Sequence, residues 1–240
     1  MLWLTGLLFS LALLVPSYGL AAIALDTSAQ SSTGSGTTIT ITGFSATSGT
    51  VLFIGSMTDG ASAASVSYNG GTFAELYDAQ NDGAGTGRTA CYIGVGATDG
   101  SAHDLTMTYD SSAGVSYLIV SAWSGVESSS NAAAHRTVYD DGTGTGDLNI
   151  TVADSQNGDV VVYAVGNFGT NLTAGNTNII TANNVPSTSY DILQQYANAS
   201  GSNTAMSVTG GQFGQACATA LIPASGGAPD VTPFYKRRLQ

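Results

Sequence analysis

Residues 38–42 read Thr38-Ile39-Thr40-Ile41-Thr42, and this short stretch decides the class of fold. Polar and apolar side chains alternate strictly, so one set faces a core and the other faces water along an extended strand. The same alternation returns at residues 105–109 and 148–152. No 11-residue window has the spacing of an amphipathic helix. The sequence therefore predicts an all-β chain and excludes a parallel α/β sheet.

Three other runs are apolar on both faces, at residues 51–54, 115–123 and 160–165. Such runs are typical of central strands that are covered on both faces. With shorter strand candidates between Gly, Asn, Asp and Ser turns, they predict about a dozen strands. Asn69-Gly70-Gly71 is the strongest hairpin signal. We expect a two-sheet antiparallel β-sandwich, jelly-roll-like in its connections.

The composition excludes several classes of function. Hydrophobic residues make up 43% of the 240 residues, enough for a core, whereas charged residues make up 9%, against roughly 25% in an ordinary domain. Five Lys and Arg against 16 Asp and Glu give a net charge of −11, which argues against binding nucleic acid through its phosphates. His103 and His135 are the only histidines, and no P-loop, G-x-S-x-G or H-E-x-x-H motif occurs. We expect no catalytic residues and no cofactor.

The acidic residues are mostly Asp in loops, where their turn-forming chemistry explains them. Ca²⁺ is the alternative, because it binds several oxygens that converge from a flexible loop. Two clusters of oxygen-bearing residues are the candidates, although neither has the spacing of a defined calcium loop: Asp78, Asn81 and Asp82, and Asp140, Asp141 and Asp147.

The two cysteines lie in predicted strands, in phase with apolar neighbours. Cys91 shares a face with Ile93, and Cys217 shares one with Leu221, so both thiols are expected to point inward. An oxidising compartment would join them in a disulfide that closes a long loop. A reducing compartment would leave two buried free thiols, and the sequence does not choose between these.

The chain divides into three parts. Residues 1–21 are apolar and signal-like, residues 22–225 form the sandwich, and residues 226–240 combine a Gly/Pro linker with a basic tail. The first segment is a cleaved signal, a retained anchor, or the product of a wrongly assigned start. The tail carries Lys236, Arg237 and Arg238, which either dock on an acidic neighbour, including another copy, or stay solvated.

One internal similarity links residues 81–88 with residues 140–147, both strings of Asn, Asp, Gly and Thr. It is compatible with two related half-sandwich units. We favour the alternative that such strings are the ordinary composition of β-loops.

Four segments carry a resemblance to a known kind of module: residues 65–71, 116–126, 158–162 and 216–224. They are similar to a β-sandwich module of phage virion structural and decoration proteins and of bacterial surface proteins, and residues 22–27 fit its opening. The resemblance implies a non-enzymatic decoration or fibre-type subunit on a virion surface. Its partners would be copies of itself and neighbouring coat or filament subunits.

Two alternatives remain open. The apolar N-terminus favours a secreted or cell-surface subunit, such as a filament subunit or adhesin, that touches a membrane only through residues 1–21 if these are retained. A carbohydrate-binding module is the third reading, and it requires exposed aromatic rings for a glycan or host-surface contact. Phe168 is the aromatic residue most expected to be exposed.

Overall fold

A computed structural model describes residues 22–33, 35–80, 87–128, 136–140, 148–168, 171–182, 190–210 and 214–224. These residues form sixteen strands and no helix, which confirms the all-β prediction. The first eight strands are β1 (Ala24–Thr33), β2 (Gly36–Ser45), β3 (Val51–Thr58), β4 (Ala63–Ser67), β5 (Thr72–Gln80), β6 (Arg88–Val95), β7 (Ala102–Ala113) and β8 (Ser116–Ser124). The last eight are β9 (Arg136–Asp140), β10 (Leu148–Ala153), β11 (Val160–Phe168), β12 (Thr173–Ala174), β13 (Thr177–Ala182), β14 (Tyr190–Asn198), β15 (Asn203–Thr209) and β16 (Gln215–Leu221).

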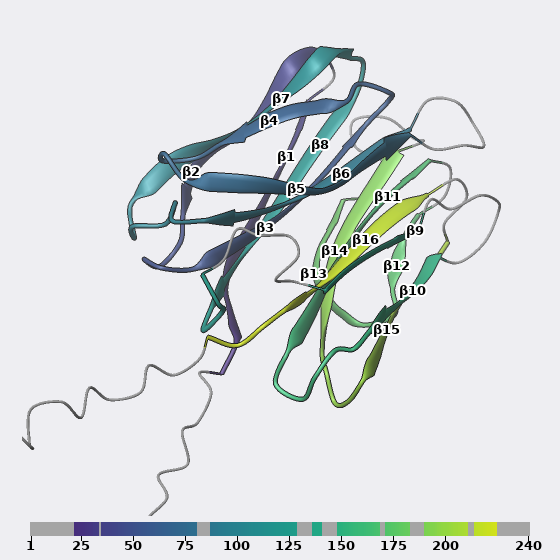
Figure 1. The fold of residues 1–240 in the computed structure, drawn as a ribbon. Coiled ribbons are helices and arrows are strands. Elements are labelled where there is room, and N and C mark those ends of the chain that lie inside the picture. The colour runs from purple at the N-terminus through teal and green to yellow at the C-terminus, as the bar shows by residue number, and fades with distance from the viewer. Residues whose placement is uncertain are drawn as a thin grey trace, which may run out of the picture.

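The first eight strands form one sandwich, and the last eight form a second one (Figure 1). The first pairs a sheet of order β1-β8-β3-β6-β5 with a sheet of order β2-β7-β4, and every pairing is antiparallel. This is the strand order of a jelly roll, except that β5 extends the sheet of β6 instead of pairing with β4. The second sandwich repeats the order with each strand number raised by eight: β9-β16-β11-β14-β13 and β10-β15-β12. The chain is thus a tandem pair of jelly rolls.

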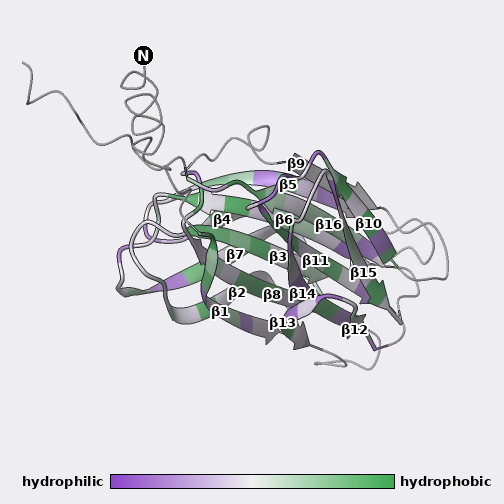
Figure 2. Cartoon of the chain, turned by 90° about the horizontal axis from the view of Figure 1, so that it is seen from below, coloured by the Kyte–Doolittle hydropathy of each residue, from purple (hydrophilic) through white to green (hydrophobic). Residues whose placement is uncertain are grey.

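The four sheets stack as four layers, with the two five-stranded sheets in the middle. One apolar cluster fills each sandwich, and a third lies between the two five-stranded sheets. The inner sheets are therefore covered on both faces, and every residue of β3 and of β16 is buried. Figure 2 shows the resulting hydrophobic stripe along β3 and β11. The prediction that the runs apolar on both faces form central strands is confirmed.

The outer sheets show the alternating pattern. In β10, burial alternates residue by residue from Leu148 to Ala153, and in β2 the buried Ile39 and Ile41 are separated by Thr40. The water-facing side of β2 and β7 carries hydroxyls, and those of Thr40 and Thr106 lie 3.0 Å apart in a hydrogen bond.

The antiparallel sandwich prediction is confirmed, but the described residues form four sheets and sixteen strands where two sheets and about a dozen strands were expected. The prediction that Asn69-Gly70 forms the turn of a hairpin is wrong. The turn itself forms, with positive φ at Asn69 (41°) and Gly70 (69°) and a hydrogen bond from Gly71 N–H to Tyr68 O. However, β4 pairs with β7 and β5 pairs with β6, so this turn carries the chain from one sheet to the other.

The two jelly rolls are related by a pseudo-two-fold axis. β3 packs over its counterpart β11, β1 over β13, β8 over β14, and β6 over β16. Because the strand order of one inner sheet runs opposite to that of the other, the axis runs along β3 and β11 between the two sheets. The packing is that of a symmetric dimer whose two halves belong to one chain.

Candidate functional site

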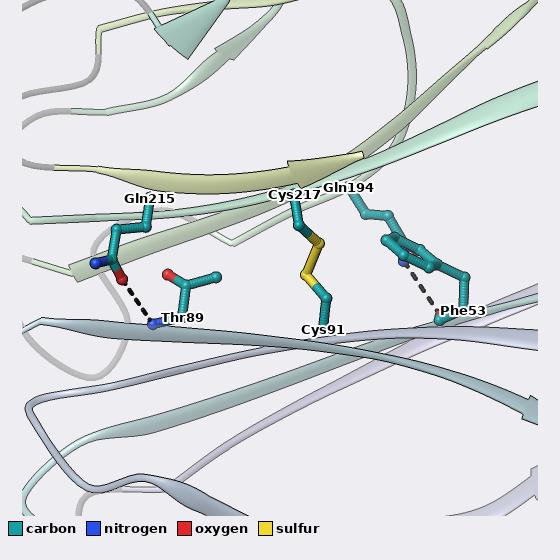
Figure 3. Close-up of a disulfide and its surroundings, with 6 residues drawn as sticks. All are labelled: Phe53, Thr89, Cys91, Gln194, Gln215 and Cys217. Carbon is teal, nitrogen blue, oxygen red and sulfur yellow. Dashed lines mark hydrogen bonds between the residues drawn. A yellow bond between two sulfur atoms is a disulfide. The ribbon is translucent and has the colours of Figure 1, made fainter. Parts of the chain in front are cut away.

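The layer between the inner sheets holds the most distinctive chemistry among the described residues. Cys91 on β6 and Cys217 on β16 form a disulfide across this layer, with their Cα atoms 6.7 Å apart (Figure 3). The bond links residues 126 positions apart, and both cysteines are fully buried. On the chain-entropy account, closing a loop of this order stabilises a fold by about 4–5 kcal/mol at 25 °C. The disulfide thus joins one jelly roll to the other.

Side-chain amides also cross the layer, one on each side of the disulfide (Figure 3). Gln194 Nε2 donates to Phe53 O at 3.3 Å, and Gln215 Oε1 accepts from Thr89 N–H at 3.1 Å. Both glutamines are fully or almost fully buried. Burying a side-chain amide costs free energy unless the amide forms hydrogen bonds. These two bonds therefore favour one alignment of the two sheets over others in an interface that is otherwise apolar.

At the axis the two sheets approach closely because glycine replaces larger residues. A Cβ on Gly55 would lie 2.9 Å from Ala164 Cβ, and a Cβ on Gly166 would lie 2.9 Å from Met57 Cγ. Gly55 is equivalent to Ala164, and Met57 is equivalent to Gly166, since both pairs lie 109 positions apart in facing strands. Each glycine makes room for its neighbour's side chain.

The disulfide breaks this symmetry. Cys91 pairs with Gly55 in its sheet, and Gln194 pairs with Ala164 in the other sheet, so Gln194 occupies the position equivalent to Cys91. By the same reasoning Ile119 occupies the position equivalent to Cys217. One half of the layer is thus joined covalently, while the equivalent half carries a glutamine hydrogen bond.

Aromatic residues close one end of the layer. Trp123, which is 1% exposed, meets Tyr196 edge to face with the ring centroids 5.2 Å apart. Its Nε1–H donates to Ser121 Oγ at 2.8 Å, which satisfies the indole inside the core. Elsewhere in the same layer, the Tyr117 hydroxyl on β8 donates to the backbone oxygen of Tyr190 on β14 at 3.2 Å.

A second polar group lies on β5 and β6 in the first jelly roll. Arg88 Nε donates to Asp78 Oδ1 at 2.6 Å, and the Tyr92 hydroxyl lies 3.0 Å from Glu75 Oε2. Burial raises the pKa of Tyr92, and the negative charge of Glu75 raises it further. Tyr92 therefore stays protonated and donates to the carboxylate.

A third polar group involves His103, at a surface turn. His103 Nε2 lies 3.1 Å from Asp99 Oδ2, and Tyr68 packs edge to face against the imidazole. The hydrogen bond from Ser101 N–H, followed by the bond to His103, lowers the pKa of the Asp99 carboxyl. These contacts hold the turn between β6 and β7 in place.

The calcium candidates are only partly described. Asp78 is held by Arg88, so its carboxylate is already neutralised by an ion pair. Asp140 ends β9, and its side chain is not described. Asn81, Asp82, Asp141 and Asp147 lie outside the described residues, as do Lys236, Arg237, Arg238 and His135. Within the described ranges no group of three or more His, Cys, Asp or Glu is arranged to hold a metal ion.

Other expectations depend on exposed surface. Leu25, 38% exposed, is the one large hydrophobic side chain of the described set in the exposed class. Phe168, the aromatic residue most expected to be exposed, ends strand β11, and its side chain is not described. No helix in the described ranges is long and apolar enough to span a membrane.

A comparison with protein-family models, with curated proteins and with solved structures finds no match.

Sequence reasoning missed the two glutamines and the close approach at the axis. Gln194 and Gln215 looked like ordinary polar residues, and only Gly49 and Val51, repeated at Gly158 and Val160, marked β3 and β11 as equivalent. This repeat, at an offset of 109, was the available signal of duplication. The similarity between residues 81–88 and 140–147 does not reflect this duplication. Those segments follow β5 and β9, which are not equivalent strands in the two jelly rolls.

Proposed function

We propose that this chain is a non-enzymatic structural subunit of a surface assembly, in the first place a decoration or fibre-type protein of a virion. The observation that carries the proposal is the layer between the two jelly rolls, which has an apolar core and a buried disulfide. Such a layer turns two small sandwiches into one rigid block. Its polar side chains serve packing and registration.

The disulfide supports a location outside a reducing cytoplasm. Disulfides persist in secreted proteins and on virion and cell surfaces, where the environment is oxidising. The exported cell-surface subunit is favoured by this same observation and is the second candidate, with residues 1–21 as its distinguishing feature.

Surface composition also supports a structural role. The outer strands present Thr, Ser and Asn rather than long charged side chains, and Lys236 is the one lysine of the sequence. Among the described residues the edge strands β1 and β13 each pair with one neighbour, which leaves an edge of each for contacts between copies. The carbohydrate-binding alternative receives no such support, since no aromatic side chain of the described residues is in the exposed class.

The test is assembly of the full chain. Mass photometry and negative-stain electron microscopy over a concentration series, together with fractionation of the native source, should find the chain in ordered multimers or bound to particles. Recovery as a dilute monomer at all concentrations, and absence from particle and surface fractions, would contradict the proposal. Recovery on cell envelopes instead of virions would select the second candidate.

A further inference from the structure

The disulfide between Cys91 and Cys217 lies away from the edges of both inner sheets. Cys91 on β6 pairs with Gly55 on β3 and with Tyr77 on β5, and Cys217 on β16 has β11 and β9 as its neighbours. Both cysteines are fully buried. Each is shielded within its own sheet by the neighbouring strands and across the layer by the facing sheet.

The layer is also closed on either side of the bond. Gln194 donates to Phe53 O on one side, and Gln215 accepts from Thr89 N–H on the other (Figure 3). Around these amides, apolar side chains form a cluster that is distinct from the clusters inside the two jelly rolls. The layer is therefore one packed unit with the disulfide inside it.

Reduction of a disulfide requires direct contact with one of its sulfur atoms. A thiolate of a dithiol reductant bonds to one cysteine sulfur while the S–S bond breaks, and the other cysteine leaves as a thiolate. The second thiolate of the reductant then displaces the first cysteine and closes a cyclic disulfide. Two electrons pass to the protein, and each cysteine thiolate takes up a proton that the reductant released. Neither step can begin while both sulfur atoms are covered.

We propose that the Cys91–Cys217 bond is a redox lock that a dithiol can open only after the two inner sheets have separated around it. Each jelly roll has its own apolar core, so the two can part while each stays folded. The bond then persists in a reducing environment for as long as the layer stays closed. This gating goes beyond the structural role proposed above and does not depend on assembly.

Two buried isoleucines distinguish separation of the layer from unfolding of a jelly roll. Ile119 on β8 lies in the cluster between the inner sheets, and Ile54 on β3 lies in the core of the first jelly roll. Both are fully buried, so Ile119→Ala and Ile54→Ala remove the same atoms from equally buried positions. Ile119→Ala weakens the layer, whereas Ile54→Ala weakens the first jelly roll itself.

The test follows reduction of the full chain by dithiothreitol in the absence of denaturant. Samples are quenched with acid, unfolded and alkylated, and the free thiols are counted by mass. We expect the folded chain to be reduced at least about 100-fold more slowly than the same chain unfolded in urea. Ile119→Ala should speed reduction of the folded chain by about tenfold or more, and Ile54→Ala should leave the rate within about twofold. In urea the unmodified chain and both variants should react equally fast.

Two results would overturn the proposal. If neither substitution changes the rate, the reductant reaches the bond without separation of the layer. If both raise it equally, reduction requires unfolding of a jelly roll. Should an alanine variant fail to fold, Ile119→Val and Ile54→Val give the same comparison, with an expected acceleration of about threefold for the first only. Assembly is measured separately by particle size, so this inference and the proposed function fail independently.

Discussion

Gly55 and Ala164 occupy equivalent positions in the two jelly rolls and pack against each other at the pseudo-two-fold axis. A Cβ on Gly55 would lie 2.9 Å from Ala164 Cβ and 3.1 Å from Ile119 Cγ1. The inner sheets approach as closely as they do because a methyl group is present on one side only. This pair is therefore one of the contacts that allow the two jelly rolls to approach closely at the axis.

The first prediction concerns that pair. Gly55→Ala should destabilise the chain by about 1–3 kcal/mol, because well-packed cores do not accept an added methyl group without displacement. Ala164→Gly should relieve part of the collision in the double variant. Urea unfolding of the two single variants and the double variant gives the coupling free energy. Strictly additive effects would show that the two residues do not share a contact.

The second prediction concerns the disulfide between Cys91 and Cys217. Replacing both cysteines by alanine should lower the free energy of unfolding by about 2–5 kcal/mol, because the unfolded chain regains the freedom lost on closing a loop of more than 100 residues. Urea unfolding with and without a reductant measures the change. The reduced unmodified chain serves as the control and should unfold near the variant's midpoint. A reductant-insensitive midpoint in the unmodified chain would mean that the thiols are not joined.

The third prediction concerns alkaline pH. Burial raises the pKa of Tyr109 to about 12, above its ordinary value of 10.0, while its hydroxyl shares a 2.8 Å hydrogen bond with Ser56 Oγ. Since the folded state resists ionisation, stability is full below pH 10 and falls as the pH rises toward 12, by up to about 2–3 kcal/mol. The higher pKa of Tyr92 acts in the same direction.

Urea midpoints measured from pH 8 to pH 11 check this, with tyrosinate absorbance as a second readout. Tyr109→Phe should flatten the decline, although the hydroxyl it removes also lowers stability at pH 8. A decline of the same slope in Tyr109→Phe and in the unmodified chain would assign the effect to other groups.

The fourth prediction concerns calcium. Because Asp78 is held by Arg88, added Ca²⁺ is expected to leave the melting temperature unchanged, as is a chelator. The control is Arg88→Gln, which frees the Asp78 carboxylate without adding ligands. If millimolar Ca²⁺ raised the melting temperature by several degrees and a chelator reversed the rise, the prediction would be wrong and the loop clusters would be calcium ligands.

Local patterns predicted what depends on local geometry. Alternation in residues 38–42 and 148–152 identified strands with one wet face, and apolar runs such as residues 51–54 identified strands covered on both faces. The inward direction of Cys91 and Cys217 followed from the same period of two. Each of these is a property of one strand, because successive side chains of an extended chain point to opposite faces.

The sequence by itself therefore determined that this protein is an all-β sandwich and which of its strands are inner and outer. The tertiary structure alone decided that there are two jelly rolls, that Asn69-Gly70 joins two sheets, and that Cys91 meets Cys217. The physical reason is that an alternating strand buries its apolar face equally well against many partners. Its actual neighbour is selected by contacts between distant residues, such as Gly55 on Ala164 and Gln194 on Phe53, which no local window contains.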